Sequence, residues 1–151
     1  MWLELNPDLL RTHLAEPEIT ALETAATTAD VANILKEETH NVAESWRGRI
    51  RKGHSIDKRT DYVPSELLQF ILVHVRYASY TRLPNMETLL DKLRQEEWRR
   101  ANKVFDDPFY IDIEDPEEEF LEESSTDPVV FVSRSNYRMD IYPDGIIRTQ
   151  R

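Results

Sequence analysis

Few residues of this sequence combine the types and the spacing that catalysis or metal binding needs. Glu37 and His40 have the Glu-x-x-His spacing of helical sites that hold two metal ions. Such a site also needs a second Glu-x-x-His pair and two further glutamates on facing helices, and the sequence contains no second pair. We therefore interpret both residues as polar groups on a solvated helix face and expect no metal ion.

The sequence also lacks the signatures of nucleophilic and phosphate-binding sites. It contains no cysteine and only 3 glycines, with no Gly-x-Ser-x-Gly elbow and no glycine-rich phosphate loop. His74 lies in the apolar stretch 67–80, where we expect a hydrogen-bonded core or interface residue. That stretch is too short to cross a bilayer. We expect a protein that is not an enzyme, has no catalytic residues, binds no cofactor and does not enter a membrane.

The net charge of -10 comes from one acidic arm. Residues 104–133 contain no Lys or Arg, whereas eleven Asp and Glu residues fall between positions 106 and 128. Isolated segments of this composition usually stay solvated and without fixed structure, so we expect a partner chain to hold this one. Ten of the carboxylates form a candidate docking arm: Asp106, Asp107, Asp112, Glu114, Asp115, Glu117, Glu118, Glu119, Glu122 and Glu123.

A basic patch precedes the arm in the sequence, with Asp57 as its one acidic neighbour. Cations at the end of a helix are favoured by the helix dipole, which is one interpretation of the patch. The other is a surface that contacts phosphate or the acidic arm of a neighbouring subunit, in a head-to-tail contact that can close a ring. The patch consists of Arg47, Arg49, Arg51, Lys52, Lys58 and Arg59.

Helical periodicity dominates the first 105 residues. Asn6 is a good N-cap for a helix that starts at Pro7, and a second short helix restarts around residues 16–18. A third helix, capped by Thr27 or Thr28, should run from about residue 29 to about residue 51 along an apolar stripe.

Two further helices complete this body. The fourth follows Val63-Pro64-Ser65-Glu66 and is apolar nearly all round, which favours a place at the centre of a bundle or between a bundle and a neighbouring subunit. The fifth is expected to start at Asn85, as its cap, and Pro108 should close it.

The pattern changes from helical to extended near the C-terminus. Residues 129–132 and 137–142 are rich in β-branched and aromatic side chains, and Pro143-Asp144-Gly145 predicts a turn before residues 146–148. A ribbon this small needs a surface to lie on. Its candidate contact residues are Val130, Phe131, Tyr137, Ile141 and Tyr142.

The predicted fold class is therefore mainly α. We expect a five-helix body at 1–105, an acidic extended arm at 106–128 and a short β-ribbon at 129–151.

Several short motifs of the body resemble one protein family. They are Leu5 to Leu10, Glu18 to Leu22, Trp46-Arg47-Gly48-Arg49-Ile50, Tyr62 to Leu67, Val75-Arg76-Tyr77 and the charged stretch from Leu90 to Phe105. Together they resemble the small head–tail connector (adaptor) proteins of tailed bacteriophages and Mu-like prophages, of the head-completion type. The acidic arm and the ribbon exceed what the shortest members of that family contain.

The resemblance implies a structural virion protein with a connector-like helical body. Such proteins form rings, commonly of twelve copies, between the portal and a stopper or tail-terminator protein, and they extend the channel for double-stranded DNA without sequence-specific binding. The implied location is the neck of the virion, after synthesis in the cytoplasm of a bacterial host. The alternative is a small helical regulatory or nucleic-acid-binding protein that uses the basic patch and has an acidic autoinhibitory tail.

Overall fold

The computed structural model of the protein describes residues 1–122, 140–141 and 147–148. Its described part is mainly helical, as predicted. The α-helices are α1 (Pro7–Arg11), α2 (Glu16–Ala25), α3 (Val31–Ile50), α4 (Leu68–Arg82) and α5 (Lys92–Asp106). Four single-turn 3-10 helices accompany them: η1 (Ser65–Leu67), η2 (Glu87–Leu89), η3 (Pro108–Tyr110) and η4 (Glu118–Phe120).

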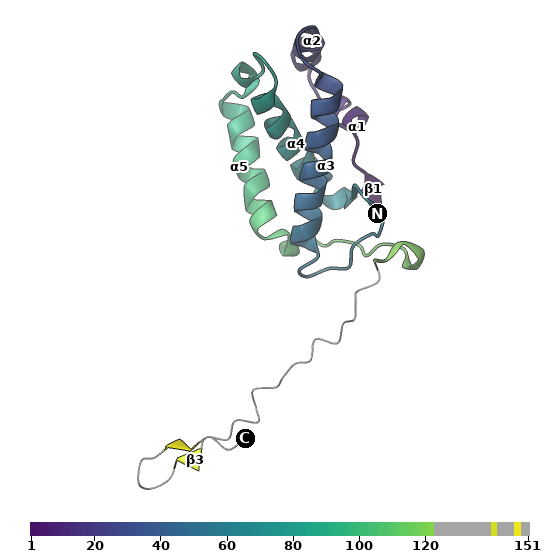
Figure 1. Ribbon diagram of the computed structural model, residues 1–151, viewed down its shortest axis with the longest axis vertical. Helices are drawn as coiled ribbons and strands as arrows, with labels where there is room; N and C mark the ends of the chain where they lie inside the picture. The colour runs from purple at the N-terminus through teal and green to yellow at the C-terminus, as the bar shows by residue number, and fades with distance from the viewer. Residues whose placement is uncertain (123–139, 142–146, 149–151) are drawn as a thin grey trace.

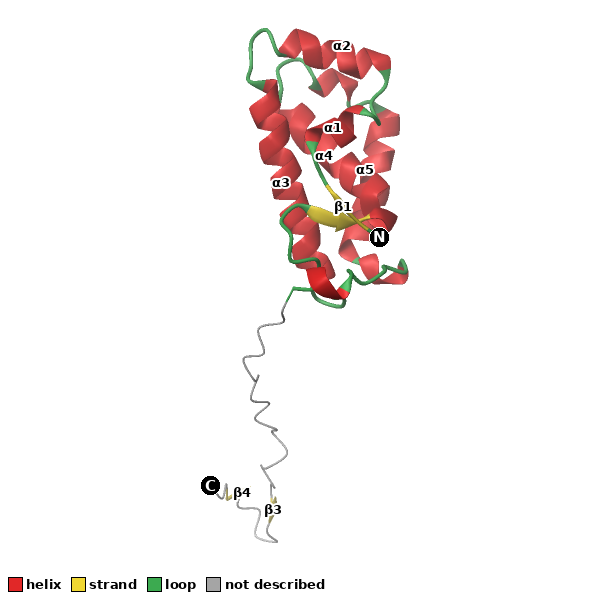
Figure 2. Ribbon diagram, turned by 90° about the vertical axis from the view of Figure 1, so that its right-hand side faces the viewer, coloured by secondary structure: helices red, strands yellow, loops and turns green. Residues whose placement is uncertain are grey.

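Two small antiparallel pairs of strands are present in the described residues. Strand β1 (Trp2–Glu4) pairs with β2 (Tyr62–Pro64), with Leu3 opposite Val63. This pair lies across one face of the helices near their lower end (Figure 2). Strands β3 (Asp140–Ile141) and β4 (Ile147–Arg148) form the second pair, within the predicted ribbon.

Helix α4 lies at the centre of the helical body, between α3 and α5 (Figure 1). No residue from position 70 to position 80 is exposed, and Ile71, Val75 and Tyr80 are fully buried. A helix without a polar face must be covered by neighbours, because each large apolar side chain gains about 1.5–3 kcal/mol from burial. The predicted central position of this helix is confirmed. Among the described residues, no helix is long and apolar enough to cross a membrane.

Of the predicted N-caps of α1 and α3, the first is confirmed and the second is wrong. Asn6 caps α1 as expected, since its side chain accepts a hydrogen bond from the Leu9 amide at 2.8 Å. The cap of α3 is Asp30 rather than Thr27 or Thr28, because the Asp30 side chain accepts from the Asn33 amide.

The predicted start of the fifth helix is wrong. Asn85 has a left-handed backbone with φ of 61°, whereas an N-cap residue has an extended backbone, and only the single turn η2 follows it. The cap of helix α5 is Asp91, six residues later, whose side chain accepts from the Arg94 amide at 2.9 Å. The start of α5 is set by a side chain that accepts a hydrogen bond from the backbone amide three residues later, as Asp91 does from Arg94.

His74 is partly buried and hydrogen-bonded, and it packs against aromatic side chains of α3 and α5. The indole Nε1 of Trp46 donates to His74 Nδ1 at 3.1 Å, and both rings pack against Phe105. Burial lowers the pKa of His74 below its usual value. Protonation of Nδ1 would also turn this acceptor into a second donor facing the indole N–H.

The stability of the protein should therefore fall as the pH falls below about 6.5, the usual pKa of an unfolded histidine. In that range the unfolded chain binds a proton that the folded chain excludes. We expect His74→Gln, which keeps an acceptor, to have a flatter pH dependence of the free energy of unfolding between pH 7.5 and pH 5. His13→Gln, at an exposed position, should keep the wild-type slope. Equal slopes for wild type and His74→Gln would contradict this assignment.

Candidate interaction surfaces

The first part of the acidic arm is attached to the chain's own helical body. The amide of Lys58 donates to Phe120 O at 2.7 Å, and the amide of Glu122 donates to Ile56 O at 3.0 Å. The Trp2 indole donates to Glu114 O at 2.9 Å, and the side chain of Ile113 is buried. We expected a partner chain to hold the acidic arm, but contacts within the chain hold its residues 106–122.

An ion pair between a buried carboxylate and a partly exposed arginine lies next to this attachment. Asp57 is fully buried, and both of its carboxylate oxygens accept hydrogen bonds from the Arg59 guanidinium, Oδ2 at 2.6 Å from Nη2. The guanidinium carbon lies 3.8 Å from the Tyr62 ring centroid and 3.6 Å from the Phe120 centroid. Arg59 is thus held between an aromatic ring of the body and an aromatic ring of the acidic arm. We call this arrangement the Arg59 clamp.

The Arg59 clamp keeps its carboxylate charged. Burial alone raises the pKa of Asp57, but the hydrogen bonds and the positive charge of Arg59 outweigh burial, and the pKa is lowered from its usual value. Arg47 adds a further positive charge and donates to Asp57 O at 2.7 Å.

The predicted basic patch does not form one open surface, because four of its six members bond within the chain. Arg47 is buried and donates to the backbone oxygens of Asp57 and Tyr62. Arg49 donates to the backbone oxygens at the C-terminal end of α5, and Arg51 forms a two-bonded pair with Glu122 at 3.1 and 3.0 Å.

Lys52 and Lys58 are the remaining two members of the patch. Both are exposed, and neither forms an ion pair with another described residue. The arginines of the predicted patch thus have a structural role, and the lysines remain at the surface.

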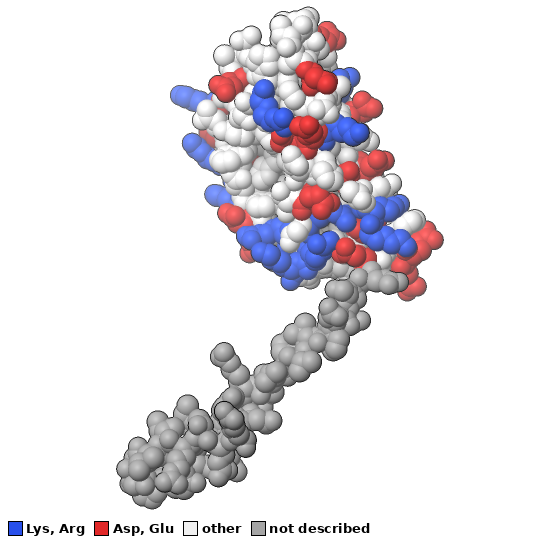
Figure 3. All heavy atoms as spheres, in the orientation of Figure 1, with Lys and Arg blue, Asp and Glu red and all other residues white. Residues whose placement is uncertain are grey.

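The attached arm displays its carboxylates to solvent from a fixed backbone. Acidic side chains gather at the lower right of the body, near the end of the described chain (Figure 3). We define the acidic strip as six residues that are all exposed: Asp112, Glu114, Asp115, Glu117, Glu118 and Glu119. Glu114 also accepts a hydrogen bond from the Met1 amino group at 2.8 Å.

Several predicted contact residues fall outside the part of the chain that the structure describes. They are Glu123, Val130, Phe131, Tyr137 and Tyr142, together with the side chain of Ile141.

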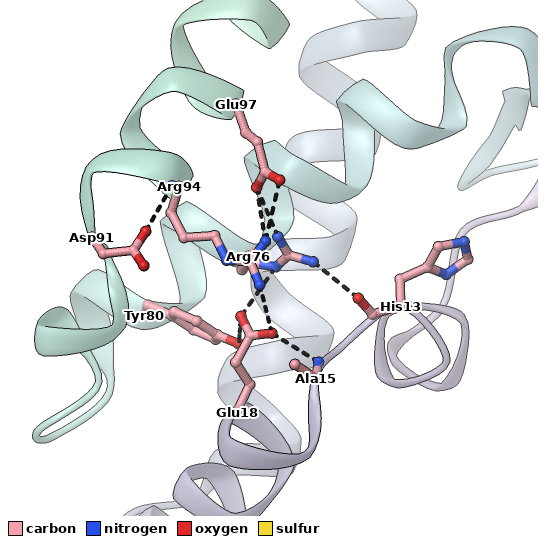
Figure 4. A network of polar contacts seen from close by, with 8 residues as sticks. All are labelled: His13, Ala15, Glu18, Arg76, Tyr80, Asp91, Arg94 and Glu97. Carbon is pink, nitrogen blue, oxygen red and sulfur yellow. Dashed lines mark hydrogen bonds and ion pairs between the residues drawn. The ribbon is translucent and has the colours of Figure 1, made fainter.

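A second charged cluster, which the spacing did not indicate, joins α2, α4 and α5 (Figure 4). The side chains of Glu18 and Arg76 are 5% and 9% exposed, so both are almost completely buried. Arg94 donates to Glu18 at 3.1 Å and to both oxygens of Glu97, and Arg76 donates to Glu97 at 3.2 Å. Two arginines and two glutamates therefore balance one another inside the bundle.

Neutral groups satisfy most of the remaining hydrogen-bonding capacity of this cluster. Tyr80 donates to Glu18 at 3.0 Å, the Ala15 amide donates to Glu18 at 2.8 Å, and Arg76 donates to His13 O. Burial and the nearby Glu18 carboxylate raise the pKa of Tyr80 well above its usual value. The sequence contained one signal of this cluster: Arg76 lies in an apolar helix, and a buried cation requires a partner.

The two residues with Glu-x-x-His spacing have different partners. Glu37 accepts from Arg82 at 3.0 Å, whereas His40 Nδ1 lies 2.7 Å from Asp61 Oδ1. Within the described residues, no three His, Cys, Asp or Glu side chains are placed to hold one metal ion.

Comparison with protein-family models, with curated proteins and with solved structures finds no match for this chain.

Breaking the Arg59 clamp should loosen the attached arm. We expect Arg59→Gln to speed hydrogen exchange at the amides of Lys58 and Glu122, because both amides donate across this attachment. The exposed control Lys58→Gln should leave exchange at these amides unchanged. Since the pKa of Asp57 is lowered, the clamp should persist at about pH 4, where about half of free aspartates are protonated. Unchanged protection in Arg59→Gln would show that the clamp does not hold the arm.

Removing Glu18 should destabilise the body strongly. We expect Glu18→Ala to lower the free energy of unfolding by about 3–5 kcal/mol, because it leaves buried arginine charge without its partner. Glu23→Ala, at an exposed position of the same helix, should change it by no more than about 0.5 kcal/mol. Urea denaturation followed by circular dichroism measures both values, and equal midpoints for the two variants would contradict the prediction.

Proposed function

We propose that this protein is a structural component of a tailed bacteriophage, a ring-forming adaptor between the portal and the stopper or tail proteins. In this role the ring extends the channel through which double-stranded DNA passes. The protein acts by assembly and not by catalysis.

The observation that carries the proposal is where the family-like motifs lie in the fold. Trp46 and Ile50 are fully buried in α3, and Val63 is fully buried in β2, directly before the turn that starts α4. Arg76 is the arginine of the buried ion network. The residues that resemble the adaptor family are therefore those that determine the packing of this body, which supports a shared body plan.

The fixed acidic strip is a second supporting observation. A charged segment without attachment presents no defined surface, whereas this one is fastened by backbone hydrogen bonds and by the Arg59 clamp. A fixed pattern of charge suits a contact that must repeat identically from subunit to subunit.

The alternative function, a nucleic-acid-binding regulator with an autoinhibitory tail, is favoured by one contact. Arg51 pairs with Glu122, so the predicted patch and the predicted tail do meet within one chain. Release of the tail would not open the whole patch, however, because Arg47 and Arg59 bond to the buried Asp57 and its neighbours. A titration with duplex DNA at several salt concentrations separates the two functions: tight binding with a steep salt dependence would favour the regulator.

Assembly tests the proposed function directly. We expect the purified chain to form closed rings of one defined mass, seen by native mass spectrometry and negative-stain electron microscopy. Removal of residues 123–151 should leave the helical content of the described body intact and reduce the fraction of rings. A chain that stays monomeric at every concentration, and also in the presence of its portal protein, would refute the proposal.

A further inference from the structure

The outer face of α5 carries exposed cations that have no counterion in the described part of the chain. Arg99, Arg100 and Lys103 are all exposed, and none of them takes part in the ion pairs that this helix forms within the described residues, which involve Arg94, Glu97 and Asp106. Figure 3 shows Lys and Arg side chains along the left edge of the body, which is the edge that α5 forms in Figure 1.

A groove of about 350 Å³ opens beside these cations, between α4 and α5. Phe70, Leu72 and Val73 supply apolar walls, and Arg76, Arg94 and Arg100 supply positive charge. Glu18 and Glu97 balance Arg76 and Arg94, which leaves Arg100 unbalanced at the groove.

One buried donor of the groove also lacks an acceptor. The Nε of Arg76 has no hydrogen-bond partner within the described chain, although its side chain is only 9% exposed and lies 3.5 Å from Glu18 Oε1. Because this Nε is buried beside Glu18, the positive charge available to bind a carboxylate at the groove is that of Arg100.

The acidic strip cannot fill this groove within the same chain. It leaves the lower end of α5, passes under the helices and ends on the side of β1, away from the outer face of α5 (Figure 1). Its backbone is held there by the hydrogen bonds of Lys58 and Glu122. A second copy of the chain can present its strip to the groove, and its opposite charge favours that encounter.

We propose that the α4–α5 groove, with Arg100 and the adjacent Arg99, binds the acidic strip of a neighbouring copy of this protein. The contact is head-to-tail, because each copy binds one neighbour through its groove and another neighbour through its acidic strip. Such contacts close into rings or continue as filaments. This inference rests on the proposed function and names the two surfaces that join its subunits.

Charge reversal of each surface, alone and combined, tests the contact in the full-length chain. The groove variant is Arg99→Glu with Arg100→Glu, and the strip variant is Glu118→Lys with Glu119→Lys. We expect each to weaken self-association about tenfold or more in sedimentation velocity at about 50 mM salt, where charges are weakly screened. The combined variant should recover association, because the reversed groove then meets a reversed strip.

The matched control is Arg11→Glu with Lys36→Glu, which changes the net charge by the same amount as the groove variant. Both control positions are exposed and lie outside α5 and the acidic strip. The control should associate as the wild type does, and all variants should keep the wild-type circular dichroism spectrum and melting behaviour.

The possible failures have different meanings. If the wild type forms rings and neither surface variant weakens them, the contact is wrong and the ring-forming function stands. If the wild type never associates, both proposals fail. If the groove variant loses binding to a duplex of about 20 base pairs while self-association is unchanged, the groove binds phosphate and the inferred contact is overturned.

Discussion

The fold depends on covering α4 from all sides. This helix has no exposed residue between positions 70 and 80, so it is stable only when α3 and α5 enclose it. The enclosure also buries one arginine, Arg76, whose charge must be balanced in a medium that hydrates it poorly. Glu18 of α2 and Glu97 of α5 supply that balance. The same constraint thus places three helices around the central one and fixes their register.

Polar contacts extend this body beyond the last helix. Asp57 is a fully buried carboxylate in a loop, and Arg59 neutralises it while lying between Tyr62 and Phe120. Backbone hydrogen bonds to Ile56 and Lys58 then fix the chain up to Glu122. A segment rich in like charges is held against the body because Ile113 and Pro116 are buried there and Phe120 packs on Arg59, while its carboxylates remain in water.

Two of the charged patches lie at different edges of the described surface. Exposed cations lie on the outer face of α5, and exposed carboxylates lie on the attached arm at the other edge (Figure 3). Because opposite charges at separate edges attract copies of one molecule in a fixed order, this distribution is consistent with a subunit of a ring. The connection between fold and proposed function is therefore the placement of charge by a rigid helical body.

The sequence by itself determined the mainly helical body, the cap at Asn6 and the central place of α4, because these follow from local hydrogen bonding and from apolar periodicity. The start of α5, the pairing of β1 with β2 and the partners of the basic patch were decided only by the tertiary structure. Arg47, Arg59 and Arg76 show why: the sequence does not identify the partner of any of them, and each lies where other segments of the chain supply its acceptors. The sequence identifies the charged residues, whereas the fold determines which counterion each of them meets.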